Sequence, residues 1–130
     1  MVSTLVVTLG NSGEALIEAT NHIIGGSNTL GCYCVGWNVD LEEAKSELGA
    51  AIRKIDRGDG VLLLTDMFGG TSTNISLSFY SPNRVEVITG VNLPMVVKAL
   101  TLPRNISVAD ASAVLRNQAR KAIYIASEVL

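Results

Sequence analysis

The segment that decides the fold reads Gly60-Val61-Leu62-Leu63-Leu64-Thr65-Asp66-Met67-Phe68-Gly69-Gly70-Thr71. Residues 61–64 are continuously apolar and lack the alternation of a strand with one wet face. Such a run is typical of a strand covered on both faces by helices in a parallel sheet. The polar and glycine-rich residues that follow predict a loop, and then a short helix through Ile75, Leu77 and Phe79.

The same order of strand, loop and helix recurs on both sides of this segment. Strands are predicted at Leu5–Val7, Thr29–Val35 and Val85–Thr89, each followed by a helix. The helices are predicted from Asn11 or Ser12 to Ile23, from an Asp40 cap to Ile55, and from Pro94 to Leu100. A last helix, capped by Ser107, is predicted to run through Ala122 and Ala126. We therefore expect a single α/β domain over residues 1–130, with an open, mostly parallel sheet of four or five strands and helices on both faces.

Composition limits the classes of function. The 130 residues make about one domain, and 48% of them are apolar, which suffices for one core. Ten basic residues against twelve acidic ones argue against nucleic-acid binding. The longest apolar run, Ala122–Ala126, is too short to span a membrane, and the N-terminus does not resemble a secretory signal. A cytoplasmic protein is expected.

The two cysteines and the single histidine do not predict a metal site. Cys32 and Cys34 lie on one face of a predicted strand, too far apart for an ordinary disulfide, and two thiolates are too few for zinc. His22 lies about three turns into the first helix. All three are interpreted as structural residues, and no metal or cofactor is expected.

Candidate functional residues lie in the loops after the strands, because ligands of open parallel sheets bind at the carboxyl ends of the strands. Asp66 stands without an obvious partner after the third strand. Gly69, Gly70 and Thr71 at a helix start suit a phosphate, although the same tripeptide is also expected of a tight turn that caps a helix. The predicted cleft is further lined by Gly10, Asn11, Phe68, Asn92 and Pro94.

Together these loops carry a family resemblance. The segment from Gly60 to Thr71, with Asn74 and the run Glu86-Val87-Ile88-Thr89-Gly90-Val91-Asn92-Leu93-Pro94-Met95, resembles the enzyme IIA domain of the mannose-type bacterial sugar phosphotransferase system. The likeness covers essentially the whole chain. It implies a cytoplasmic homodimer, often with exchanged C-terminal segments. It also implies a phosphoryl relay, in which a loop histidine takes phosphate from the histidine carrier protein HPr and passes it to a IIB component.

One residue departs from this pattern. The family's phosphoaccepting histidine follows the first strand in a pattern like Thr-His-Gly, and this sequence reads Thr8-Leu9-Gly10. The resemblance matches Asp66 to the carboxylate that orients the histidine, and Gly69, Gly70 and Thr71 to the phosphate cradle. Ser72 stands where many relatives have proline, a change expected to alter helix entry more than chemistry. An alkyl side chain has no lone pair to accept a phosphoryl group, so the usual relay is excluded.

The favoured hypothesis is therefore a phosphoacceptor-deficient IIA component that works as a regulatory or docking module. Its partners would be HPr-like or IIB-like proteins or another regulator, with a membrane reached only through a transporter. Two alternatives remain open. Asp66 itself could accept phosphate as in receiver domains, although that chemistry needs further carboxylates to hold a metal. Alternatively, Leu9 could be an engineered replacement in an active carrier.

Overall fold

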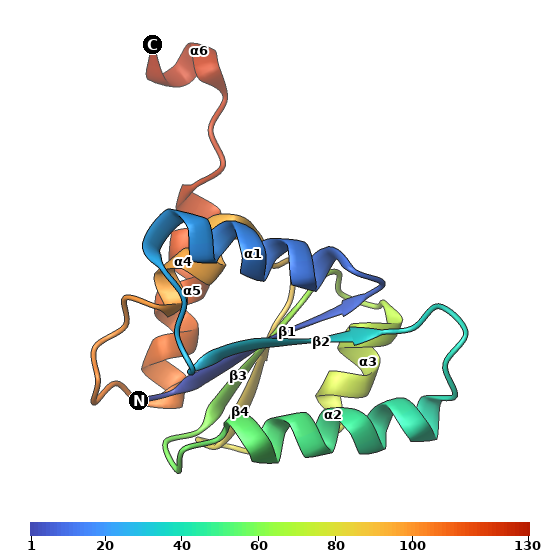
Figure 1. Cartoon of the computed structure of the whole chain (residues 1–130). Helices are drawn as coiled ribbons and strands as arrows, with labels where there is room; N and C mark the ends of the chain where they lie inside the picture. The colour runs from blue at the N-terminus through green and yellow to red at the C-terminus, as the bar shows by residue number, and fades with distance from the viewer.

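The computed structural model describes residues 1–130 as a four-stranded parallel sheet between two layers of helices (Figure 1). The strands are β1 (Ser3–Leu9), β2 (Leu30–Val35), β3 (Val61–Thr65) and β4 (Val85–Ile88). They lie in the order β2-β1-β3-β4. The helices are α1 (Ser12–Ile24), α2 (Leu41–Ile55), α3 (Thr71–Leu77), α4 (Leu93–Ala99), α5 (Val108–Lys121) and α6 (Ala126–Val129). The predicted fold class is confirmed, with four strands.

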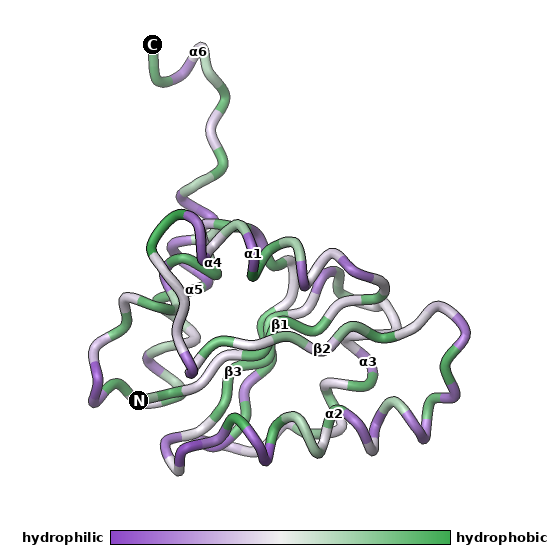
Figure 2. Tube along the Cα trace, in the orientation of Figure 1, coloured by the Kyte–Doolittle hydropathy of each residue, from purple (hydrophilic) through white to green (hydrophobic).

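The central strands β1 and β3 are buried on both faces, which explains the apolar runs 5–7 and 61–64 within them (Figure 2). In β3, Leu62 and Leu64 point into the core under α1, α4 and α5, whereas Leu63 points to the core under α2 and α3. In β1, Val6 and Val7 divide between the same two cores. Helices on both faces are therefore required to remove these side chains from water.

Two predicted helix caps are confirmed. The Asp40 carboxylate accepts from the Glu43 N–H at 3.1 Å, and the Ser107 hydroxyl accepts from the Asp110 N–H at 3.1 Å. At α1, Asn11 holds the N-cap position but makes no side-chain cap hydrogen bond. The Thr8 hydroxyl, on the strand before the helix, accepts the Gly13 N–H at 2.9 Å instead.

The prediction that the last helix reaches Ala126 is wrong. Helix α5 ends at Lys121, and the chain then leaves the body of the molecule before the short α6 (Figure 1). Ile123, Tyr124 and Ile125 are exposed. β-branched and aromatic residues are weak helix formers, and this run has no core to pack against, so nothing extends the helix.

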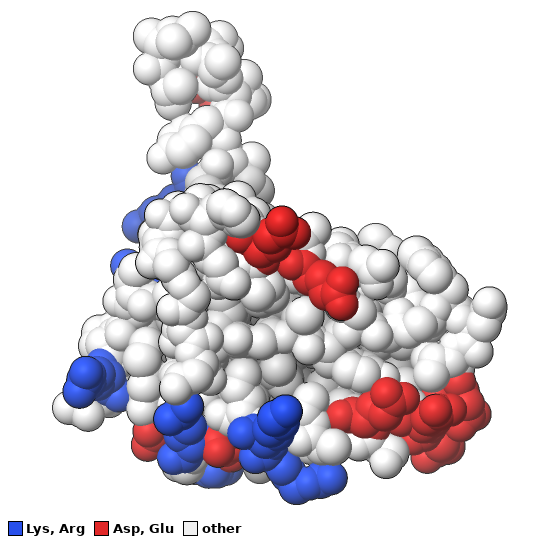
Figure 3. Space-filling view, viewed as in Figure 1, with Lys and Arg blue, Asp and Glu red and all other residues white.

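Charge is separated along α2 (Figure 3). Its start, beside the carboxyl ends of the strands, carries Asp40, Glu42, Glu43 and Glu47, while its end and the turn after it carry Arg53, Lys54 and Arg57. None of the helices has the length and apolar character needed to cross a membrane.

Candidate functional site

The site is built where β1 and β3 end side by side. Their regular pairing stops at Val7 and Thr65. Beyond that point the Leu9 N–H donates to Oδ2 of Asp66 at 2.9 Å. A side chain from the loop after β3 thus links the two strand ends where the backbone hydrogen bonds between them stop. The structure thus brings together Leu9 and Asp66, which are 57 residues apart in the sequence.

Asp66 is not unpartnered, as its sequence context suggested. Its second oxygen, Oδ1, accepts from the Met67 N–H at 2.9 Å and from the hydroxyl of Ser72. Ser72 is fully buried in the first turn of α3. The Ser72 hydroxyl thus anchors the start of α3 to the candidate carboxylate. That a serine there affects helix entry more than chemistry stays a prediction.

Leu9 presents an alkyl group at this site and uses it for packing. Its half-buried side chain packs against the apolar cluster under α2 and α3. His22 lies in the last turn of α1, where Nδ1 is 2.9 Å from the Glu18 carbonyl oxygen. Because α1 begins next to the end of β1 and runs away from it, the only imidazole of the chain is at the far end of that helix.

The predicted phosphate cradle forms the turn before α3. Gly69 has a φ of +84°, and Gly70 is the N-cap residue, whose N–H donates to the Met67 carbonyl at 3.1 Å. The hydroxyl contacts in this turn come from Thr73, which donates to the Met67 carbonyl and meets the Thr65 hydroxyl, both at 2.7 Å. That Gly69, Gly70 and Thr71 bind a phosphate stays a prediction.

A residue that the sequence reasoning did not select, Trp37, lies beside the site. Its side chain is 76% exposed, yet its indole covers the buried Gly10, whose φ is +76°. A Cβ on Gly10 would lie 2.7 Å from Cζ2 of Trp37. The sequence feature that could have identified Trp37 is its position, since it is a tryptophan in a loop that follows a predicted strand. Asn11, the next residue, is exposed.

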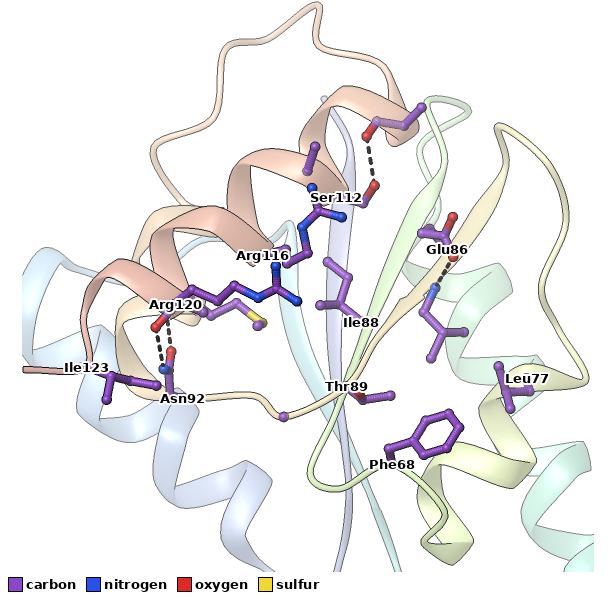
Figure 4. A pocket seen from close by; sticks show the side chains of 16 residues that line it. Phe68, Leu77, Glu86, Ile88, Thr89, Asn92, Ser112, Arg116, Arg120 and Ile123 are labelled. Carbon is purple, nitrogen blue, oxygen red and sulfur yellow. Dashed lines mark hydrogen bonds between the residues drawn. The ribbon is translucent and has the colours of Figure 1, made fainter.

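A groove of about 640 Å³ opens between α5 and β4 (Figure 4). Of the residues expected to line one cleft, Phe68 and Asn92 line this groove, while Leu9 and Asp66 do not. Asn92 has a structural role: Oδ1 caps α4 by accepting the Met95 N–H, and Nδ2 donates to the Ala119 carbonyl of α5. Pro94 lies elsewhere, in a hollow of about 300 Å³ with Ile23 and Val97. The expected single cleft is thus divided.

The cysteines do not belong to the site. Both are free and half-buried on β2. Burial, followed by the neighbouring Cys34 sulfur, raises the pKa of the Cys32 thiol to about 11. Cys32 is therefore a protonated, weakly nucleophilic thiol at neutral pH.

Comparison with known proteins gives one consistent result. The protein-family model EIIA-man, described as the fructose IIA component of the phosphotransferase system, matches residues 3–118. The fructose-specific EIIA component of Bacillus subtilis is 28% identical over 131 residues, covering 100% of this chain and 90% of that protein. The mannose-specific EIIAB component of Escherichia coli K12 is 30% identical over 101 residues, which is 75% of this chain and 31% of that longer protein.

Solved structures agree in fold. The IIA protein associated with the fucose utilization operon of Streptococcus pneumoniae superposes with a TM-score of 0.84 at 19% identity, covering 100% of both chains. The mannose/sorbose-specific IIA subunit of Enterococcus faecalis gives a TM-score of 0.83 at 21% identity, covering 95% of this chain and 93% of that one.

Proposed function

Because the chain belongs to the mannose-type family of phosphotransferase IIA components, we propose that it is a phosphoacceptor-deficient member of that family. It works in the cytoplasm as a docking or regulatory module of a sugar phosphotransferase system. The observation that carries this proposal is the contact between Leu9 and Asp66, in which the carboxylate holds a backbone N–H and the adjoining side chain is an alkyl group.

The chemistry of the site supports the loss of phosphoryl transfer. A phosphoacceptor needs a lone pair, and Leu9 has none. Asp66 is a poor substitute, because both of its oxygens are engaged by donors that fix the surrounding loops: the N–H groups of Leu9 and Met67 and the hydroxyl of Ser72. The arrangement favours the docking role over the receiver-like alternative.

Large exposed apolar side chains surround the site and support a docking role. Trp37, Met67 and Phe68, which we call the edge surface, are 76%, 66% and 76% exposed. They come from the loops after β2 and β3 and therefore share the carboxyl edge of the sheet. Clustered exposed aromatic and methionine side chains are enriched at protein interfaces.

Charge indicates the kind of partner. The acidic start of α2 lies at the same edge, so a partner with an apolar contact face and basic residues around it is favoured. Within a phosphotransferase system we propose an HPr-like or a IIB-like protein for this role. Contact with the membrane then comes only through the transporter complex.

Calorimetric titration with purified HPr and IIB proteins tests this function. We expect one of them to bind, and Trp37→Ala to lower its affinity by about tenfold or more, as is usual for a central aromatic anchor. Tyr80→Ala is the matched control, since Tyr80 is an exposed aromatic residue after α3, outside the edge surface. Uptake of phosphate by the unmodified chain from phosphoenolpyruvate, enzyme I and HPr contradicts the proposal.

We further propose a homodimer in which the segment 122–130 of one copy docks on the other. The exposed apolar residues Ile123, Tyr124 and Ile125 support this arrangement, because they have no cover within their own chain. The groove between α5 and β4 lies along β4, which is an edge strand of the sheet.

Charge in the groove agrees with this occupant. Arg116 and Arg120, one turn apart on α5, line the groove, and neither forms an ion pair within the chain (Figure 4). The docking segment carries Glu128, the one acidic residue after Asp110. A carboxylate on the incoming segment gives these guanidinium groups a partner.

A further inference from the structure

The outer edge of β4 determines whether a further strand can join the sheet. The Arg84 carbonyl accepts from the Val61 N–H of β3 at 2.8 Å, so the backbone groups of Arg84 face inward. Backbone groups alternate in direction along a strand. Those of Val85 and Val87 therefore face outward, toward the groove.

Three of these four outward groups already have a partner, and only the Val87 carbonyl has none. Both backbone groups of Val85 pair with Ser81, which donates to the Val85 carbonyl at 3.0 Å and accepts from the Val85 N–H at 2.9 Å. The Val87 N–H donates to Oε1 of Glu86 at 2.9 Å. Glu86 is half-buried and lines the groove itself. We call the contact between Glu86 and the Val87 N–H the Glu86 cap.

We propose that the Glu86 cap controls strand addition at β4: its carboxylate occupies the hydrogen-bond donor that an incoming segment needs, and must leave before the segment can pair. This inference rests on the proposed homodimer and adds to it the residue that opposes it. An unpaired edge strand is a site of uncontrolled association, and a charged side chain at the edge is a common protection against it.

The surroundings of Glu86 allow the cap to open. The groove that Glu86 lines is open to solvent. Arg116 and Arg120 line the same groove and offer a charge partner to the displaced carboxylate. The Val87 carbonyl already lies free at the edge, so opening the cap completes a donor and acceptor pair for the incoming strand.

Sedimentation equilibrium of the full chain measures this effect on the dimer dissociation constant. We expect Glu86→Ala to lower the constant by about tenfold, because a hydrogen bond to a charged group no longer has to be broken. Glu86→Gln keeps an acceptor but loses the charge, so the dissociation constant is expected to fall by only about threefold. Glu18→Ala on α1 removes the same charge away from the groove and should leave the constant unchanged.

Amide hydrogen exchange of Val87 at a concentration where the chain is monomeric is the second readout. The Glu86 cap predicts faster exchange in Glu86→Ala than in the wild type, and equal rates overturn it. A wild-type dimer with the same dissociation constant in Glu86→Ala refutes control by Glu86 and leaves the homodimer standing. If the wild type, Ile125→Asp and Glu86→Ala are all monomeric, the proposed homodimer is refuted. The Val87 exchange rate then still tests whether Glu86 protects the Val87 N–H.

Discussion

The N–H of Leu9 donates to the Asp66 carboxylate at 2.9 Å, and this contact joins the ends of two neighbouring parallel strands beyond the last regular pair. Asp66 also holds the Met67 N–H and, through Ser72, the start of α3. One carboxylate thus fixes three segments at the carboxyl edge of the sheet. In this chain, its visible role is to organise the loops that carry the exposed apolar residues.

Loss of this carboxylate is expected to destabilise the fold. Asp66→Ala removes three hydrogen bonds to a charged acceptor and should lower the free energy of unfolding by about 2 to 4 kcal/mol. Ser72→Ala removes one of them and should cost about 1 kcal/mol. Urea denaturation measures both changes. Ser46→Ala, at an exposed position of α2, is the control and should change stability by less than about 0.5 kcal/mol.

Restoring an imidazole at the end of β1 is expected to restore phosphate acceptance. Asp66 and the turn at Gly70 and Thr71 are still present beside the position of Leu9. Leu9→His should take up one phosphoryl group from phosphoenolpyruvate, enzyme I and HPr, as measured by intact mass, while the wild type takes up none. The variant gives up apolar packing, with an expected cost of about 1 to 3 kcal/mol. A folded Leu9→His protein that stays unmodified shows that other parts of the site have diverged.

The contact between Trp37 and Gly10 gives a prediction of non-additivity. Gly10→Ala forces a side chain into a left-handed backbone conformation and against the indole, so we expect a loss of about 1 to 3 kcal/mol in unfolding free energy. In the double variant with Trp37→Ala the clash disappears, whereas the backbone strain remains. The loss in the double variant should therefore be smaller than the sum of the two single losses, as thermal or urea unfolding can measure.

The raised pKa of Cys32 predicts a pH dependence at the alkaline end. The thiol titrates near 9.0 when the chain is unfolded and at about 11 when it is folded. Between these values the folded state binds more protons than the unfolded state. The contribution of Cys32 to the free energy of unfolding is therefore complete below pH 9 and is lost as the pH rises toward 11. Cys32→Ala should reduce this fall, measured as the slope of unfolding free energy against pH. An unchanged slope contradicts the assignment.

The docking of residues 122–130 is testable by substitution in the exposed tail. Ile123→Asp together with Ile125→Asp places charges where apolar side chains must be buried against a second copy, so the dimer should be lost. Light scattering after size-exclusion chromatography measures the mass. Thr101→Asp, at an exposed position after α4, serves as the control. A doubly substituted protein that remains dimeric places the interface elsewhere.

Local sequence sufficed for most of the fold. The uninterrupted apolar run Val61–Leu64 predicts a buried parallel strand, because such runs are typical of strands covered on both faces. The caps at Asp40 and Ser107 follow from bonds to residues three positions away. The alternation of strands and helices then places Leu9 and Asp66 at one edge, since parallel strands end on the same side.

Tertiary structure alone decided which side chains meet at that edge. The hydroxyl of Ser72 reaches Asp66 only once α3 has packed on β1 and β3, and Trp37 covers Gly10 only once β2 lies beside β1. The groove needs α5 and β4, and its separation from Pro94 depends on how α4 and α5 pack. These contacts depend on the relative placement of elements far apart in the chain. The sequence therefore determined the order and burial of the helices and strands. The packing of β1, β3 and α3 against one another determined which groups bind Asp66.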